Sequence, residues 1–229
     1  MKKFIHSTLR YGFSALFILV TIELLMWLAK PSPAAFALPS EILREIPKFF
    51  LPDDLGYDLL GTLRRTFIAF SLSLPIGIIL GVVTIKSRWI NRELYFFIDF
   101  IRSIPATALI PLFLVLFGTG DISKIAVGVL SGGLVVTVSV IVGYQSLSEN
   151  RKIISIFIGA RTAASLCLIL VVVGEMFIGS VDGLGKIIMD RRYSDDVPTL
   201  YAAIVMTGLV GYTINMIFVF IESKIKLLI

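Results

Sequence analysis

The stretch Thr66–Ile85, TFIAFSLSLPIGIILGVVTI, contains 20 residues and no charged side chain. A membrane-spanning helix needs about 20 apolar residues to cross about 30 Å of hydrocarbon, because each residue adds about 1.5 Å of length. The stretch therefore predicts a transmembrane helix. Transmembrane β-strands would be about 10 residues long with alternating polarity, and this continuous apolar run does not fit that pattern.

The composition of the whole chain agrees with this prediction. Of its 229 residues, 57% are hydrophobic and 16% are charged, and the mean hydropathy is +0.94. A soluble domain is about half apolar and about one quarter charged, and a disordered chain is poorer still in apolar residues. Cys167 is the only cysteine, so a disulfide scaffold is excluded as well. The composition indicates an integral membrane protein.

Further apolar runs extend the prediction to an all-α integral membrane protein with six spans. The first run also fits a signal peptide, because Lys2 and Lys3 precede it and Ala35-Phe36-Ala37 resembles a cleavage site. Its 19 residues exceed the usual 7–15, so an uncleaved first span is favoured over that alternative. The predicted spans are 9–29, 61–85, 96–117, 124–143, 154–178 and 199–221.

Basic residues set the predicted orientation. With both termini in the cytoplasm, the inner side carries ten basic and three acidic residues, whereas the outer side carries nine basic and ten acidic residues. This excess follows the positive-inside rule and accounts for most of the net charge of +5. A basic stripe with interleaved aromatic residues, typical of nucleic-acid binding, is missing from the sequence. The long outer segment 30–58 is predicted to contain a short helix over 41–50, capped by Ser40.

The sequence offers no catalytic set. His6 is the only histidine and lies beside the N-terminus, so neither a Ser-His or Cys-His pair nor a His/Cys metal site can form. The segment 179–186 has glycines and a lysine but fails the phosphate-loop spacing, and Ile187 replaces the required Ser or Thr. We therefore expect no enzyme activity, cofactor site or metal site in this chain.

Ionisable residues within the predicted spans are candidates for a transport path, because each is costly unless it is paired or faces water. Asp99 and Arg102 share a helix face, as a self-neutralising pair or as part of a gate. Arg161 is expected to snorkel or to line the path. Glu175, near the outer end of span five, is expected to pack or hydrogen bond, with substrate contact as the alternative. Glu23 is a candidate for a helix interface.

Prolines and glycines indicate bent, closely packed helices. Pro75, Pro105 and Pro111 fall inside predicted spans, where each frees a backbone carbonyl, and such breaks often line transport paths. The pairs Gly77/Gly81 and Gly128/Gly132 allow close helix contact. The candidate path or gate residues are Asp99, Arg102, Pro105, Pro111, Arg161 and Glu175.

The stretch Arg102–Lys124, RSIPATALIPLFLVLFGTGDISK, resembles the third-to-fourth span signature of binding-protein-dependent ABC importer permeases. The resemblance is closest to the branch that imports nitrate, taurine, aliphatic sulfonates and related small molecules. Four shorter stretches support it: Leu38–Ser40 (LPS), Leu60–Phe70 (LGTLRRTFIAF), Val171–Phe177 (VVVGEMF) and Gly183–Gly185 (GLG).

One departure concerns the cytoplasmic loop between spans four and five. In the family this loop carries a Glu-Ala-Ala motif and a Leu-Pro, and its short helix docks into the ATPase subunit. Here only the nine residues Tyr144–Lys152 connect the apolar runs and neither motif is present, so this chain lacks the segment or couples differently. Residual docking, as opposed to an ordinary solvated turn, would fall on Ser148, Glu149, Asn150, Arg151 and Lys152.

The resemblance implies a type I ABC importer-like permease bundle in a bacterial inner membrane. It implies a first helix and outer segment over 1–58, and a five-helix permease domain over 59–229. It also implies two ATP-binding cassette ATPases, an extracytoplasmic solute-binding protein and a second permease copy, with a homodimer expected. The alternative is a self-sufficient secondary transporter or channel, whose coupling site would have to use Asp99, Arg161 or Glu175.

Overall fold

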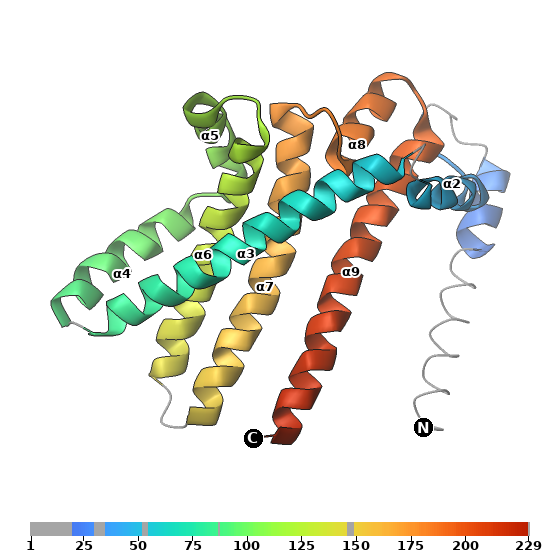
Figure 1. The fold of residues 1–229 in the computed structure, drawn as a ribbon. Helices are drawn as coiled ribbons and strands as arrows, with labels where there is room; N and C mark the ends of the chain where they lie inside the picture. Colours follow the sequence, from blue (N-terminus) through green and yellow to red (C-terminus); the bar gives the residue numbers. More distant parts are fainter. Residues whose placement is uncertain (1–19, 30–34, 52–54, 87, 146–148, 229) are drawn as a thin grey trace.

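The structure is a computed structural model that describes residues 20–29, 35–51, 55–86, 88–145 and 149–228. Within these residues the fold is helical and contains no strand, as Figure 1 shows. After a helix at Val20–Ala29, the labelled helices are α2 (Pro39–Glu45), η1 (Ile46–Phe50), α3 (Gly56–Lys86), α4 (Arg88–Ser103), η2 (Ala106–Leu109), α5 (Ile110–Phe117), α6 (Asp121–Tyr144), α7 (Glu149–Ile178), α8 (Leu184–Tyr193) and α9 (Val197–Leu228).

Four of these helices are long and apolar enough to cross a membrane. They are α3, α6, α7 and α9, whose most apolar windows have mean hydropathies between 2.0 and 2.5. They confirm the spans predicted at 61–85, 124–143, 154–178 and 199–221. Of the first predicted span, residues 9–19 lie outside the described residues, and Val20–Ala29 is helical. The predicted total of six spans is not confirmed.

The third predicted span, 96–117, is wrong as a single helix. Residues Phe96–Ser103 and Ala106–Phe117 are bent by 89° at the break between them. Pro105 has extended backbone angles, with φ −56° and ψ 122°, and the residue before a proline is disfavoured in helical geometry. Pro111, by contrast, lies in the first turn of α5, and Pro75 is accommodated inside α3. Continuous hydropathy therefore concealed a break that the proline imposes.

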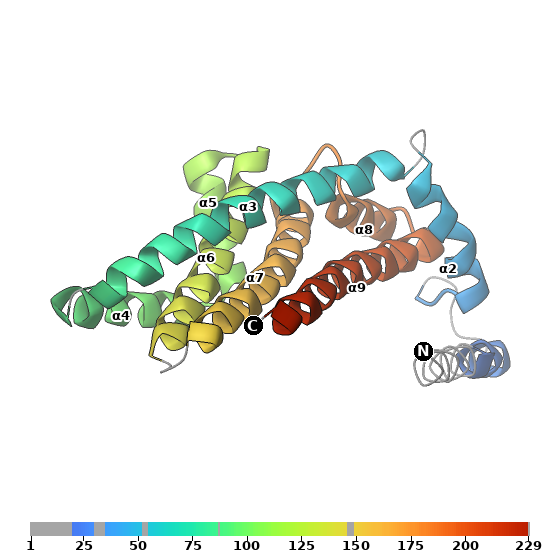
Figure 2. The ribbon, with the colours of Figure 1, turned by 60° about the horizontal axis from the view of Figure 1, so that its bottom comes forward.

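The centre of the bundle is α6, which lies between α3 and α7 (Figures 1 and 2). A Cβ atom on Gly77 would lie 2.6 Å from the Cβ of Val136, and one on Gly81 would lie 2.6 Å from the Cβ of Val140. These glycines of α3 therefore let its backbone approach α6 more closely than any other residue would allow. The predicted role of the Gly77/Gly81 pair in close helix contact is confirmed.

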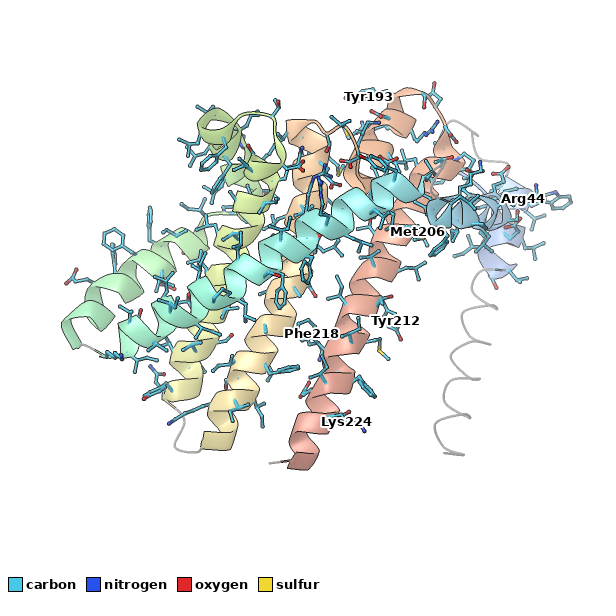
Figure 3. All side chains as sticks on the ribbon, in the orientation of Figure 1. Arg44, Tyr193, Met206, Tyr212, Phe218 and Lys224 are labelled. Carbon is cyan, nitrogen blue, oxygen red and sulfur yellow. The ribbon has the colours of Figure 1, made fainter. Side chains whose placement is uncertain are left out.

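The second glycine pair, Gly128 and Gly132, lets α6 pack closely against both of its neighbours, α3 and α7. A Cβ on Gly128 would lie 3.0 Å from the Cβ of Ala69 in α3, and one on Gly132 would lie 2.9 Å from Cys167 Sγ in α7. Half of the apolar window of α7 is buried within the chain, whereas only 11% of the α9 window is. The packed core is thus α3–α6–α7, and α9 presents apolar side chains such as Tyr212 at the periphery (Figure 3).

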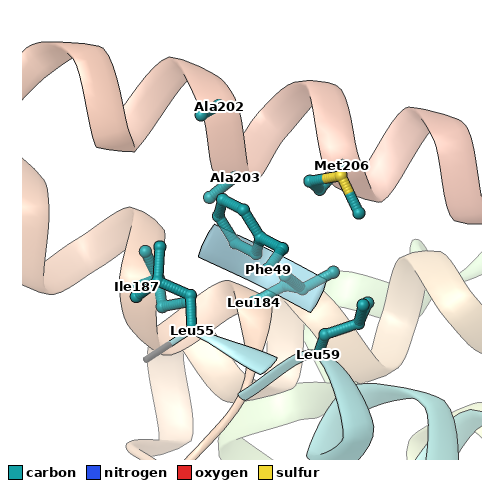
Figure 4. Close-up of a cluster of buried hydrophobic side chains, with 8 residues drawn as sticks. All are labelled: Phe49, Leu55, Leu59, Leu184, Ile187, Ala202, Ala203 and Met206. Atoms are coloured by element: carbon teal, nitrogen blue, oxygen red, sulfur yellow. The ribbon is translucent and has the colours of Figure 1, made fainter. Parts of the chain in front are cut away.

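A hydrophobic cluster joins α8 and the start of α9 to α3 and η1 (Figure 4). Phe49, at the end of η1, is 1% exposed and lies among small residues of α9. The cluster contains Phe49, Leu55, Leu59, Leu184, Ile187, Ala202, Ala203 and Met206. It fixes α8 beside the beginning of α3, which brings the segment before α8 close to the ends of α6 and α7.

The short helix predicted at 41–50 is present as α2 and η1, beginning two residues earlier at Pro39. Ser40 is not its N-cap, because Leu38 holds that position and the Glu41 carboxylate accepts the Leu38 N–H at 2.9 Å. The Ser40 hydroxyl donates instead to Glu23, at 2.7 Å, and its backbone N–H donates to the same carboxylate. Glu23 therefore connects the helix Val20–Ala29 to α2.

Candidate functional site

The break between α4 and α5 opens a small pocket within the bundle. Its volume is about 240 Å³, and it is bounded by the break itself, by the middle of α6 and by Leu166 of α7. Arg102 and Pro105 both line it, together with the hydroxyl-bearing Ser131. We call this space the break pocket. It places one cationic and one hydroxyl side chain at a discontinuity in an otherwise apolar helix.

Two other candidate path residues lie close to the break pocket. Asp99 forms a long ion pair with Arg102, at 4.0 Å, and both side chains are exposed. Pro111 lies in the first turn of α5, one turn beyond the break. Of the six candidates, Arg102 and Pro105 therefore line the break pocket, whereas Asp99 and Pro111 lie in the helices on either side of the break.

The other two candidates lie elsewhere. The Arg161 guanidinium donates to Asn215 and lies 3.8 Å from Glu222, so it connects α7 to α9. Glu175 has a side chain that is 0% exposed, and it belongs to a group of buried charges at the opposite end of α7. Arg161 and Glu175 do not contact one another, in agreement with their spacing along the helix.

Arg65 is the centre of this buried charged group. Its side chain is 3% exposed, and its Nε donates to Asp121 at 2.7 Å. One terminal nitrogen donates to Glu175 at 2.8 Å and to the Asp182 carbonyl at 3.0 Å, and the other donates to the Asp182 carboxylate. These four hydrogen bonds of the guanidinium join α3, α6, α7 and the segment before α8, and we call this group the Arg65 cluster.

The second oxygen of the buried Glu175 carboxylate accepts two further hydrogen bonds. Thr62 donates its hydroxyl at 2.8 Å, and the backbone N–H of Gly185 donates at 3.0 Å. Thr62 in turn accepts the Leu184 N–H at 2.8 Å. A buried carboxylate is costly unless it is paired and hydrogen bonded, and Glu175 meets both conditions.

Three glycines make this close approach possible. A Cβ on Gly61 would lie 2.6 Å from an Asp182 carboxylate oxygen, and one on Gly185 would lie 2.7 Å from the Glu175 Cβ. Gly183 has φ of +130°, which L side chains rarely adopt, and its N–H donates to Asp58 at 2.8 Å. The turn before α8 is therefore shaped to present its backbone to the cluster.

Two further cations border the Arg65 cluster. Arg64 is 61% exposed and pairs with Asp121 at 2.6 Å. Lys124 has a side chain that is only 2% exposed, yet its ammonium lies 3.8 Å from Asp121 and 3.4 Å from the Thr119 carbonyl.

Among the described residues, no group of three or more His, Cys, Asp or Glu side chains could hold a metal ion.

Most residues of this cluster were not predicted from the sequence. Arg65, Asp121 and Asp182 were not singled out, because each lies at the edge of an apolar run and looks like an ordinary boundary charge. For Arg65 and Asp121 the available signal was their position inside the motif stretches Leu60–Phe70 and Arg102–Lys124, and Asp182 directly precedes the stretch Gly183–Gly185. Contact between residues 56 to 117 positions apart could not be inferred from either stretch alone.

The connector predicted at Tyr144–Lys152 is shorter than expected. Helix α6 ends at Tyr144, and α7 begins at Glu149, so residues 149–152 form its first turn. A Cβ on Gly143 would lie 2.8 Å from the Ser155 Cβ, which shows that the two helices pack closely up to the turn. Ser148 lies outside the described residues, and Glu149, Asn150, Arg151 and Lys152 form the start of the helix.

Comparison with known proteins identifies the relatives of this bundle. Residues 73–150 match the family described as binding-protein-dependent transport system inner membrane component. A nitrate import permease protein of Synechocystis is 25% identical over 75% of this chain and 70% of its own length. This chain is related to the permease subunits of ABC importers. The resemblance stated from the sequence is therefore confirmed.

Other permease relatives cover more of the chain. An aliphatic sulfonates transport permease protein of Bacillus subtilis is 23% identical over 94% of this chain and 88% of its own length. A formylaminopyrimidine transport permease protein of Halalkalibacterium halodurans is 27% identical over 77% and 79%. The alignment with the Bacillus permease is 245 residues long and therefore longer than this whole chain of 229 residues. That relative thus carries residues opposite gaps in this chain.

The relatives and the apolar helices together support a multi-pass inner-membrane protein. The relatives named here are transport proteins rather than enzymes. The match to the family ends at residue 150, in the first turn of α7.

Proposed function

We propose that this permease forms the solute path of an ATP-driven importer for a small solute such as nitrate, taurine or a sulfonate. The observation that carries the proposal is the break pocket, where a discontinuous span places Arg102 beside a 240 Å³ space between α4, η2, α6 and α7. Broken helices at membrane depth commonly line solute sites, because their freed backbone groups and nearby charges replace water. The nitrate and sulfonate permeases among the relatives support an anionic solute.

The partners follow from the same family. An extracytoplasmic solute-binding protein delivers the solute, two ATP-binding cassette ATPases supply the energy, and a second copy of the permease completes the path. In this arrangement both termini are cytoplasmic, and the Arg65 cluster lies at the outer end of the bundle. The domain division at residue 58 separates the first helix and outer segment from the five-helix permease domain.

Coupling to the ATPases depends on the connection between α6 and α7. Four residues, 145–148, separate the two helices, whereas a docking helix of two turns alone would require about seven residues. The shortness of this connection supports the interpretation that a coupling segment is missing here. We infer that this chain engages an ATPase fully only when such a segment is inserted between residues 145 and 149.

Uptake into proteoliposomes tests the proposal. The permease, unaltered and with the relative's loop inserted, is reconstituted with ATPase and binding protein, and nitrate and taurine uptake is measured with and without ATP. The inserted form is expected to take up one of them only with ATP, and Arg102→Gln is expected to reduce that uptake at least tenfold. Arg192→Gln, on the exposed surface of α8, is the matched control and should not change uptake.

Two results would contradict the proposal. The first is an inserted form that never captures an ATPase. The second is uptake driven by a proton or sodium gradient without ATP, which would indicate a self-sufficient secondary transporter instead.

A further inference from the structure

A second pocket borders the Arg65 cluster and has no place in the proposed transport path. Its volume is about 500 Å³, and it lies where the start of α6 faces the segment that follows α7. Tyr57 and Arg64 of α3 form its rim, and Gly120, Lys124 and Ser180 line its wall. We call it the mouth pocket.

The acidic groups of the mouth pocket are already engaged. The Asp121 carboxylate accepts hydrogen bonds from both Arg64 and Arg65, and the Asp182 carboxylate accepts one from Arg65. Arg65 itself donates four hydrogen bonds to Asp121, Glu175 and Asp182. The pocket therefore retains no unengaged carboxylate among the described residues that line it.

Lys124 is held differently from the two arginines. Its side chain is 98% buried by the described residues, being 2% exposed, but its nearest acceptors lie 3.4 Å and 3.8 Å from the ammonium. Both distances exceed an ordinary charge-assisted hydrogen bond of about 2.7–2.9 Å. A buried ammonium with such weak partners has unused donor capacity, which an anion in the pocket would fill.

Further donors face the same space. The Ser180 hydroxyl is buried and has no hydrogen-bond partner among the described residues. No described side chain caps the N-terminus of α6, a helix of 24 residues whose first N–H groups are unsatisfied within the helix. Gly120 directly before it has no described atom within 4 Å of where a Cβ would be, so a ligand can reach that backbone.

We infer that the mouth pocket binds a small free oxyanion, such as a nitrate or a sulfonate group. Lys124 supplies the charge, the Ser180 hydroxyl and the first N–H groups of α6 supply further hydrogen bonds, and Arg64 stands at the rim. This binding does not require ATP, an ATPase or the path through the break pocket. A failure of anion binding in this pocket and a failure of ATP-driven uptake can therefore be distinguished.

Calorimetric titration of the detergent-solubilised full chain tests the inference. Sodium nitrate and sodium methanesulfonate are titrated at constant ionic strength into the unaltered chain and into three variants. Lys124→Met is expected to weaken binding ten- to hundredfold, because a charge-assisted hydrogen bond is lost. Ser180→Ala is expected to weaken it two- to tenfold, and it removes no internal hydrogen bond, so folding is preserved.

The control is Lys186→Met on α8, where the lysine pairs with Asp190 at 2.7 Å away from the pocket. It should bind both anions within twofold of the unaltered chain. Equal affinity in the Lys124→Met and unaltered chains, or no saturable binding of either anion, would overturn the inference. The titration is repeated in nanodiscs of phosphatidylcholine and of phosphatidylglycerol. Loss of anion binding only in phosphatidylglycerol would show that a lipid headgroup occupies the pocket. That result would overturn the inference that the pocket binds a free oxyanion.

Discussion

Arg64 and Arg65 provide a sharp test of the buried cluster, because they are adjacent and share one carboxylate. Both donate to Asp121, at 2.6 Å and 2.7 Å respectively. The Arg65 side chain is 3% exposed, whereas that of Arg64 is 61% exposed. The same substitution to methionine at the two positions therefore compares a buried ion pair with an exposed one in a single helix.

The expected magnitudes follow from burial. Arg65→Met leaves Glu175 and Asp182 without their cationic partner, and Glu175 is fully buried. Removing one partner of a buried pair costs about 3–5 kcal/mol, whereas an exposed pair contributes about 0–1 kcal/mol. For a chain of this size, 1 kcal/mol corresponds to a shift of about 2–4 °C in the melting temperature. We expect Arg65→Met to lower that temperature by about 6–20 °C and Arg64→Met by less than about 4 °C.

Thermal unfolding in detergent, followed by intrinsic fluorescence, measures both shifts. The double variant Arg65→Met/Glu175→Gln is expected to recover part of the loss, because a neutral amide still accepts from Thr62 and from the Gly185 N–H. Similar melting temperatures for the two arginine variants would refute the reasoning. So would strict additivity in the double variant, since it would mean that Arg65 and Glu175 do not interact.

Three other predictions concern the packing and the ends of the bundle. Gly77→Ala is expected to destabilise the α3–α6 contact by about 1–3 kcal/mol through overpacking, while Gly208→Ala, with no described atom within 4 Å, should be neutral or stabilising in the same melting assay. Pro105→Ala is expected to straighten the break and to reduce solute uptake in proteoliposomes; unchanged uptake would show that the bend is not needed. Glu23→Gln is expected to weaken the bonds to Ser40, so limited proteolysis should cleave 35–39 faster while the melting temperature changes little.

How much of the fold the sequence predicts depends on the length of its apolar runs. A run of about 20 predominantly apolar residues can cross lipid only as a helix, because a helix satisfies its own backbone hydrogen bonds. Helices α3, α6, α7 and α9 therefore follow from hydropathy alone. The region 96–117 is different, because its hydropathy is continuous while Pro105 imposes a change of direction. A sliding hydropathy average weighs composition and does not register backbone geometry.

The glycine pairs illustrate a middle case. The spacing of Gly77 and Gly81 indicated a close helix contact, and the structure supplies the partner, α6. The sequence could not identify this partner, because each of the apolar helices could in principle pack against any other. Helix α6 is the partner because Val136 fits against Gly77 and Val140 fits against Gly81. This fit depends on the three-dimensional packing and cannot be inferred from the spacing of the glycines.

The Arg65 cluster explains why several separate stretches carry the family resemblance. Leu60–Phe70 contributes Arg65, and the end of Arg102–Lys124 contributes Asp121. Val171–Phe177 contributes Glu175, and Gly183–Gly185 contributes the backbone that approaches it. Four stretches that look like independent motifs along the chain are thus the parts of one charged cluster. Because the central arginine needs all of its partners at once, a charge or glycine in one stretch has a physical meaning only in combination with the others.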